Sequence, residues 1–143
     1  MKPVNIGLLG LGTVGGGTAR VLASNAAEIA RRAGREIQVI HAAARGLSAE
    51  KLKGTENALL TEDAFEVVNN PDVDIVVELI GGDSPARELV LQAIANGKHV
   101  VTANKALIAK HGYEIFAAAQ ATGVVVAFEA AVAGGIPIIK AIR

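Results

Sequence analysis

A glycine turn between an apolar run and a helical pattern constrains this chain more than any other feature. Residues 4–16 read Val-Asn-Ile-Gly-Leu-Leu-Gly-Leu-Gly-Thr-Val-Gly-Gly, and a helical pattern rich in Ala, Leu and Ile fills the next ~18 residues. Gly10 permits a tight turn, Gly12 lets backbone amides approach a pyrophosphate, and Gly15 lets the helix lie close to the strand. The N-terminus of that helix faces the anion with free N–H groups and a partial positive charge. A plain glycine turn is the alternative in a chain with 16 glycines, but the strand–turn–helix setting favours nucleotide binding.

Composition indicates one compact α/β domain and argues against several other classes. The chain has 143 residues, 51% of them hydrophobic and only 3% aromatic, so the core is built from Ala, Val, Ile and Leu, as in buried parallel strands. The absence of cysteine removes disulfides and thiolate chemistry, which favours a cytoplasmic location. Fourteen basic and fourteen acidic residues cancel, so we expect no nucleic-acid partner. No signal peptide or apolar run of ~20 residues is present, so we expect no membrane association.

Strand-like segments recur along the chain and alternate with helical patterns. They lie at residues 4–9, 37–43, 74–80, 99–102 and 124–128. Strands separated by helices need crossover connections, which place the strands in parallel and the ligand at their carboxyl ends. The pattern predicts an α/β fold with a doubly wound, mostly parallel Rossmann-type sheet and helices on both faces.

Two further stretches carry local signals. Ser84-Pro85 is typical of a helix start, with Ser84 as N-cap and Pro85 as first helical residue, and Asn96-Gly97 is typical of its end. Residues 46–60 lack a clear period and are rich in turn formers, so we interpret them as a surface excursion with a short helix near 49–53.

The residue after the second predicted strand bears on the choice of dinucleotide. An acid there would bind the ribose 2′-hydroxyl of NAD, but the strand runs through Ala44 into Arg45, whose guanidinium suits the 2′-phosphate of NADP. Arg45 lies 30 positions after Gly15, which requires an extended helix between them because the usual spacing is ~20. We interpret Lys51 and Lys53, close behind, as solvated loop charges.

The next two strand ends reach the same edge of the predicted sheet. The strand ending near Ile80 is followed by Gly81-Gly82-Asp83, and Lys105 follows the strand at 99–102. Lys105 could contact the cofactor ribose or a substrate carbonyl, although in isolation it reads as an ordinary helix-starting lysine. Glu78 lies inside an apolar strand, where an unpaired carboxylate is costly, so we expect backbone amides to hold it. The three histidines, His41, His99 and His111, lack ligand spacing and are assigned no metal.

Four segments together resemble the amino-terminal part of homoserine dehydrogenase. They are Gly-Leu-Gly-Thr-Val-Gly at 10–15, Val-Glu-Leu-Ile-Gly-Gly at 77–82, Val-Thr-Ala-Asn-Lys-Ala-Leu at 101–107 and Phe-Glu-Ala-Ala-Val-Ala-Gly-Gly-Ile-Pro-Ile-Ile at 128–139. The resemblance implies NAD(P)-dependent interconversion of homoserine and aspartate 4-semialdehyde, a step toward threonine and methionine, with Lys105 near the nicotinamide nucleotide. The candidate cofactor-binding residues are Gly10, Gly12, Thr13, Val14, Gly15, Arg45, Gly81 and Lys105.

The resemblance also implies a monovalent cation, typically sodium, bound largely by main-chain carbonyls. Carried over by position, its ligands are Glu129, Val132, Gly134 and Ile136. From the residues alone, the glycine turn at 132–135 reads as a link between the last strand and the helix that Pro137 begins. The two interpretations are compatible, since converging oxygens suit hard cations.

We expect residues 1–130 to form the NAD(P)-binding domain and 131–143 to begin the substrate and dimerisation segment of a longer, homo-oligomeric protein. Helical residues run to Arg143 without a cap, which indicates a fragment. The resemblance implies that the catalytic groups lie further along the chain, so we expect the fragment to bind NADP, or NAD, and to hold no catalytic residue. Two other functions stay open at this point. One is another NAD(P)-dependent semialdehyde or dicarboxylate reductase, and the other is a non-enzymatic dinucleotide-sensing module.

Overall fold

A parallel sheet forms the centre of the molecule. The computed structural model describes residues 1–134 and 136–143. Its six strands follow the order β3-β2-β1-β4-β5-β6, and every described pairing is parallel. The strands are β1 (Val4–Leu9), β2 (Ile37–Ala43), β3 (Leu59–Thr61), β4 (Ile75–Glu78), β5 (His99–Thr102) and β6 (Val126–Ala127). The order reverses between β1 and β4, so the predicted doubly wound topology is confirmed, with its crevice at that switch point.

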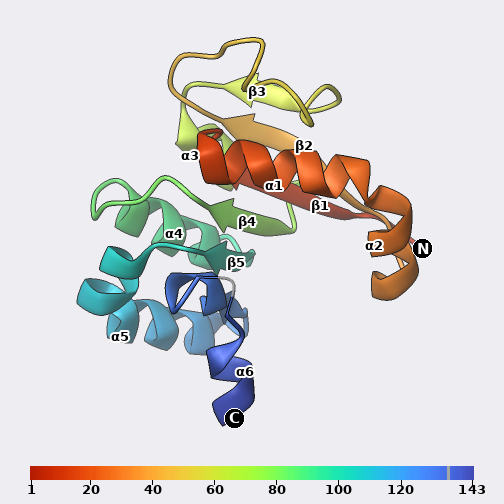
Figure 1. Ribbon diagram of the computed structural model, residues 1–143. Coiled ribbons are helices and arrows are strands. Elements are labelled where there is room, and N and C mark those ends of the chain that lie inside the picture. Colours follow the sequence, from red (N-terminus) through yellow and green to blue (C-terminus); the bar gives the residue numbers. More distant parts are fainter. Residues whose placement is uncertain (135) are drawn as a thin grey trace.

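Helices cover both faces of the sheet (Figure 1). They are α1 (Thr13–Ser24), α2 (Ala26–Ala33), α3 (Ala64–Val68), α4 (Ala86–Ala95), α5 (Lys105–Thr122) and α6 (Ile138–Ile142), with a 3-10 turn, η1 (Glu129–Ala131). Ala19 of α1 packs with Leu8 on one face, whereas Leu89 of α4 and Ile115 of α5 pack with Leu9 on the other. Alternate residues of β1 therefore serve two separate apolar layers. No helix among the described residues has the length and apolar character needed to cross a membrane.

Small aliphatic side chains let these layers pack closely. At Gly7, in the middle of β1, an added Cβ would lie 2.5 Å from Cγ1 of Val67 in α3 and 3.0 Å from Cγ1 of Val73. Both valines are buried. Glycine at this strand position is therefore required by the approach of α3, not by a turn.

Three of the five predicted strands, β1, β2 and β5, have the expected bounds, and two are shorter than expected. The segment 74–80 shortens to β4 because Glu78 turns its carboxylate to the amides of Ile80 and Gly81, which end the strand. The segment 124–128 shortens to the two residues of β6 at the sheet edge. The remaining strand, β3, was not predicted, because its three residues do not belong to a longer apolar run.

The long helix predicted after the glycine turn is two helices. Asn25 ends α1 through a bond from its N–H to the Val21 carbonyl, and the same residue is the N-cap of α2. Gly34, with φ of 75°, closes α2. The extra helix accounts for the 30-residue interval between Gly15 and Arg45.

Two local predictions need correction. Helix α4 begins at Ala86 with Pro85 as its N-cap, so Ser84 does not cap it and instead donates to Glu88 Oε2 at 3.3 Å. Its predicted end is confirmed, since Asn96 is the C-cap and Gly97 has φ of 75°. Residues 49–53 form hydrogen-bonded turns and not a helix.

Candidate functional site

The glycine turn adopts the conformation that its motif predicts. Gly10 has φ of 97°, and an added Cβ would lie 3.0 Å from the Leu79 carbonyl oxygen. At Gly15 a Cβ would lie 1.8 Å from the Gly10 carbonyl oxygen, which no side chain tolerates. At Gly12 a Cβ would meet nothing within 4 Å, because this residue faces open space. Two glycines are thus required by the backbone, and the third leaves room for a ligand.

Helix α1 presents its first N–H groups at this turn. Gly12 is the N-cap without a side-chain hydrogen bond, and the first backbone bond of the helix runs from the Gly16 N–H to the Gly12 carbonyl. Thr13 and Val14 lie exposed in the first turn. The start of α1 is therefore a set of backbone donors at the positive end of the helix, suited to an anion.

A hollow of about 640 Å³ opens beside this helix start, at the carboxyl edge of the sheet. Its walls come from the glycine turn, the end of β2, the turn after β4, and the starts of α3 and α4. The structure brings together four predicted residues here: Gly10, Gly12, Arg45 and Gly81. The lining does not include Thr13, Val14, Gly15 or Lys105.

Arg45 lies exposed on the rim of this hollow, and Lys51 supports its loop. The Lys51 Nζ donates to the Arg45 carbonyl at 2.7 Å and to the Gly46 carbonyl at 2.9 Å. The interpretation of Lys51 as a solvated charge is therefore wrong. It holds for Lys53, which is exposed and forms a surface ion pair with Glu50 at 2.9 Å.

Two acidic residues in the lining of the hollow, Glu62 and Asp63, were missed by the sequence analysis. Asp63 is the N-cap of α3, its carboxylate accepting from the Phe65 N–H at 2.9 Å. Glu62 Oε1 accepts weakly from the Gly46 N–H, at 3.4 Å. An Asp before the apolar run 64–68 is the usual N-cap signal and could have identified this helix start.

Glu78 is fully buried at the end of β4, and the expectation that backbone amides hold it is confirmed. Its Oε1 accepts from the N–H groups of Ile80 at 3.0 Å and Gly81 at 3.2 Å. Its Oε2 accepts from the Thr102 hydroxyl at 2.7 Å. The carboxylate is therefore satisfied from two neighbouring strand ends, which removes much of the cost of burying it.

Lys105 is the exposed first residue of α5, next to this buried cluster. Its predecessor Asn104 is the N-cap, with Oδ1 accepting from the Leu107 N–H at 3.1 Å. The ammonium of Lys105 takes part in none of the ion pairs found among the described residues. Asn104 is a further residue whose role the sequence analysis missed, although an Asn before an apolar helical pattern signals a cap.

The turn proposed for a cation lies between η1 and α6. Ala133 has φ of 56° and Gly134 φ of 58°, so two successive residues are left-handed. A non-glycine residue rarely adopts this conformation. The carbonyls of Glu129 and Ile136 accept from the N–H groups of Val132 and Ile138, and each keeps a lone pair for a further partner. The neighbouring Gly135 lies outside the described residues.

Each histidine has its own protein partner. His41 Nδ1 lies 3.0 Å from the Asn70 side-chain amide, and burial lowers the pKa of this imidazole. His99 Nδ1 accepts from the Val125 N–H at 3.0 Å. His111 Nε2 lies 2.6 Å from Asp83 and, as the largest contribution, lowers the pKa of that carboxyl. Among the described residues, no group of three or more His, Cys, Asp or Glu side chains could hold a metal ion.

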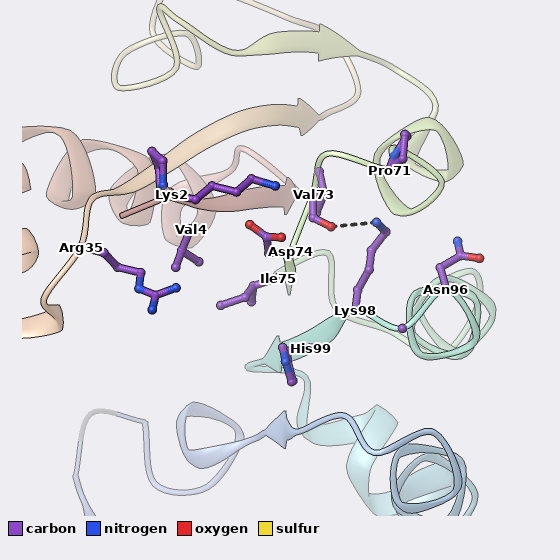
Figure 2. A pocket seen from close by; sticks show the side chains of 12 residues that line it. Lys2, Val4, Arg35, Pro71, Val73, Asp74, Ile75, Asn96, Lys98 and His99 are labelled. Atoms are coloured by element: carbon purple, nitrogen blue, oxygen red, sulfur yellow. Dashed lines mark hydrogen bonds between the residues drawn. The ribbon is translucent and has the colours of Figure 1, made fainter.

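A second hollow, of about 510 Å³, lies at the amino edge of the same strands. Figure 2 shows Lys2, Arg35 and Asp74 among the residues that line it, and Lys98 to their right with its bond to Val73. Lys98 is buried, and its Nζ donates to the carbonyls of Asn70 at 2.6 Å and Val73 at 2.8 Å. Its surroundings lower the pKa of this ammonium, mainly by desolvation.

Comparison with known proteins places this arrangement in context. Residues 10–129 match the family model described as the NAD-binding domain of homoserine dehydrogenase. A homoserine dehydrogenase of Pseudomonas aeruginosa is 65% identical over 143 residues, which cover 100% of this chain and 32% of the relative. A homoserine dehydrogenase of Bacillus subtilis is 37% identical over 143 residues, 100% of this chain and 33% of the relative. The chain thus spans about a third of the length of the curated relatives it matches.

Solved structures agree with these relatives. A homoserine dehydrogenase from Thiobacillus denitrificans superposes with a TM-score of 0.92 and 69% identity, over 100% of this chain and 33% of that one. A hyperthermophilic archaeal homoserine dehydrogenase in complex with NADPH superposes with a TM-score of 0.78 and 30% identity, over 99% of this chain and 48% of that one.

Proposed function

This chain belongs to the homoserine dehydrogenase family, as its NAD-binding domain, and from that premise we propose that it holds NADP(H) for the oxidation of homoserine to aspartate 4-semialdehyde and for the reverse reaction. The observation that carries the proposal is the turn at Gly10, Gly12 and Gly15. It leaves open space and uncapped helix donors beside a hollow large enough for part of a dinucleotide.

The pyrophosphate would lie against the backbone at Gly12 and the first turn of α1, including Thr13 and Val14. No side chain caps this helix, so its N–H groups are available to the anion. Gly15 acts indirectly, by letting the helix approach the strand. Gly81, across the hollow from Gly12, would contact the same dinucleotide.

We propose NADP as the preferred dinucleotide because Arg45 lies on the rim at the end of β2, with Ala44 instead of an acid before it. A guanidinium binds a phosphate through parallel charge-assisted bonds. The NADPH complex of the archaeal relative supports this choice. Arg45 also tolerates a 2′-hydroxyl, so we expect NAD to bind more weakly and not to be excluded.

When bound, the dinucleotide would accept a hydride from the alcohol carbon of homoserine in its oxidised form and return it to the aldehyde carbon of the semialdehyde in its reduced form. Lys105 begins α5 at the same edge of the sheet, with its ammonium exposed. A fixed positive charge there would favour negative charge developing on the substrate oxygen. We propose this role for Lys105.

The amino-acid substrate and the remaining catalytic groups belong, in our proposal, to the part of the protein outside these 143 residues. The chain spans about a third of its relatives, and apart from the electrostatic role of Lys105 we assign it no catalytic acid, base or substrate-binding residue. With homoserine and NADP, we expect this chain alone to form no NADPH above background. Turnover at the rate of the full-length protein would overturn the assignment. We further propose that the full-length protein is a cytoplasmic homo-oligomer.

A monovalent cation at 129–136 is a separate proposal. The left-handed pair Ala133 and Gly134 supports it, since strain of this kind persists where a local partner requires it. The main-chain oxygens of Glu129, Val132, Gly134 and Ile136 would supply hard oxygen ligands. Replacing sodium by tetramethylammonium at equal ionic strength should lower the thermal stability of the full-length protein. An unchanged melting temperature would argue against the site.

Calorimetric titration of the chain with NADPH and with NADH tests the main proposal. We expect NADPH to bind at least about tenfold more tightly, ~1.4 kcal/mol. Arg45→Gln should remove this preference by weakening NADPH alone. Lys53→Gln is the matched control, because it removes an exposed positive charge from the same loop without touching the hollow. Equal affinities in the wild type would discard the phosphate role of Arg45, and no binding of either nucleotide would overturn the site.

A further inference from the structure

We propose that Glu78 is a positioning residue, whose single carboxylate holds the turn carrying Gly81 at a fixed distance from the helix start carrying Lys105. The inference rests on the proposed function, because those two residues are the ones assigned to cofactor and substrate. Glu78 itself is fully buried and does not line the hollow. Any effect it has on the cofactor must therefore pass through the groups that it binds.

One oxygen of Glu78 orders the turn after β4. Oε1 accepts from the N–H groups of Ile80 at 3.0 Å and Gly81 at 3.2 Å. Gly81 and Gly82 both have positive φ, 81° and 75°, so this turn has little side-chain packing of its own to determine its path. The buried Glu78 carboxylate fixes the path of the turn by accepting from its N–H groups.

The other oxygen reaches the next strand. Oε2 accepts from the Thr102 hydroxyl at 2.7 Å, and that hydroxyl accepts in turn from the Asn104 N–H at 3.0 Å. The Asn104 side chain caps α5 through Leu107 and donates to the Gly82 carbonyl at 2.7 Å. Lys105 is the residue that follows this cap. The network therefore closes a ring between two loops at the site.

A carboxylate suits this position better than its amide. Both oxygens of Glu78 accept, and every partner described above, including a longer contact from Asn104 Nδ2 at 3.5 Å, is a donor. A glutamine would place N–H groups opposite either the backbone amides or the Thr102 hydroxyl. In the first orientation the amides of the turn face another donor, and in the second the hydrogen of the Thr102 hydroxyl loses its acceptor, so one side of the ring loses its pairing either way.

The test uses the full-length enzyme with Glu78→Gln, Thr102→Val and Thr102→Ser. Lys98→Met is the control for destabilisation, because Lys98 is also buried and charged but supports the opposite edge of the sheet. For each protein the measurements are the Kd for NADPH by calorimetry, kcat and KM for homoserine, and the melting temperature.

We expect Glu78→Gln to raise the Kd for NADPH at least about tenfold and to lower kcat. Thr102→Val cuts only the branch toward Lys105, so it should lower kcat at least about tenfold and leave the Kd within about twofold. Thr102→Ser keeps the hydroxyl and should restore kcat. Lys98→Met should change the melting temperature alone.

The inference is overturned if Glu78→Gln shifts only the melting temperature, as Lys98→Met does, or if Thr102→Val keeps the wild-type kcat. If Glu78→Gln does not fold, the two threonine variants still decide the matter. A wild-type enzyme that binds NADPH but does not oxidise homoserine would refute the proposed function instead. The Kd of Glu78→Gln would then still test the positioning role.

Discussion

Glu78 and Lys98 solve the same physical problem at opposite edges of one sheet. Each is a buried charged side chain that needs hydrogen-bond partners, and each finds them in neighbouring segments of the chain. Glu78 gathers donors at the carboxyl edge, from the turn after β4 and from Thr102. Lys98 donates at the amino edge to the carbonyls of Asn70 and Val73, and Figure 2 shows the bond to Val73.

The difference between them lies in where their partners lead. The partners of Glu78 include Gly81 and Thr102, which lies three residues before Lys105. The partners of Lys98 lie in the loop between α3 and β4, which contains no candidate cofactor residue. A buried charge is therefore not itself a sign of function. Its partners have to be followed to the site.

The largest expected effect is on the packing of the carboxyl edge itself. Gly15→Ala places a Cβ 1.8 Å from the Gly10 carbonyl oxygen, so the helix or the turn must move. We expect the free energy of unfolding to fall by about 3 kcal/mol or more, with loss of NADPH binding. Urea denaturation and calorimetry measure both.

Gly12→Ala is the matched substitution that adds a Cβ without a steric clash, because an atom there meets nothing within 4 Å. The free energy of unfolding should stay within about 1 kcal/mol of the wild type, while the Kd for NADPH rises at least about tenfold. Normal NADPH affinity in Gly12→Ala would contradict the close approach of the pyrophosphate at this residue.

At the amino edge, Lys98→Met should cost stability and leave binding unchanged. Two carbonyls lose their donor, which lowers the free energy of unfolding by about 1–3 kcal/mol. The Kd for NADPH should stay within about twofold, because no cofactor residue depends on this loop. A Kd that rises along with the instability would erase the contrast between the edges.

A smaller, pH-dependent effect is expected from His41, which accepts from the same Asn70 that binds Lys98. Burial holds the pKa of His41 below its ordinary value. The folded state therefore binds fewer protons than the unfolded state in this pH range. As a result, the free energy of unfolding is highest above about pH 6.5 and falls as the pH drops toward the lower folded pKa.

His41→Gln keeps an acceptor for Asn70 but does not titrate. Chemical denaturation between about pH 7.5 and about pH 5.5 should show a shallower decline for this variant than for the wild type. Equal slopes would show that His41 does not carry the dependence.

The smallest effect is expected at the surface of the carboxyl edge. His111 first, and then Lys110, lower the pKa of Asp83. This contribution to stability is present above the ordinary carboxyl pKa and is lost as the pH falls through the lower folded value. Because Asp83 and His111 are only partly buried and solvent screens their attraction, Asp83→Asn should shift the melting temperature at neutral pH by about 2 °C or less. A larger shift would show that the contacts of Asp83 with α5 contribute substantially to stability.

The fold could be predicted largely from the sequence because its determinants are local. The positions of Gly10 and Gly15 follow from a motif whose steric reasons act within a few residues, and both reasons hold in the structure. Strands of four residues or more show their apolar runs, but β3 has only three and pairs through the backbone with β2. The two residues of β6 lie within the longer apolar run 124–128, whereas β3 has only Leu59 and Leu60 beside Ala58, so no side-chain pattern reports it.

The site was predicted less completely because its supports are long-range. Glu78 and Thr102 are 24 positions apart, and nothing in the sequence indicates that their side chains meet. The role of Lys51 was missed because its partners are main-chain carbonyls, which every residue possesses. The capping roles of Asp63 and Asn104 were within reach, because each directly precedes an apolar helical pattern.

The two outer strands of the sheet have a consequence for how the chain behaves in concentrated solution. β3 has three residues and β6 has two, so each margin exposes few unpaired backbone groups. Another chain that tried to extend the sheet would gain few hydrogen bonds and would soon run into a loop. Short outer strands are a common protection against strand-to-strand aggregation, and here they protect a sheet built mostly from aliphatic side chains.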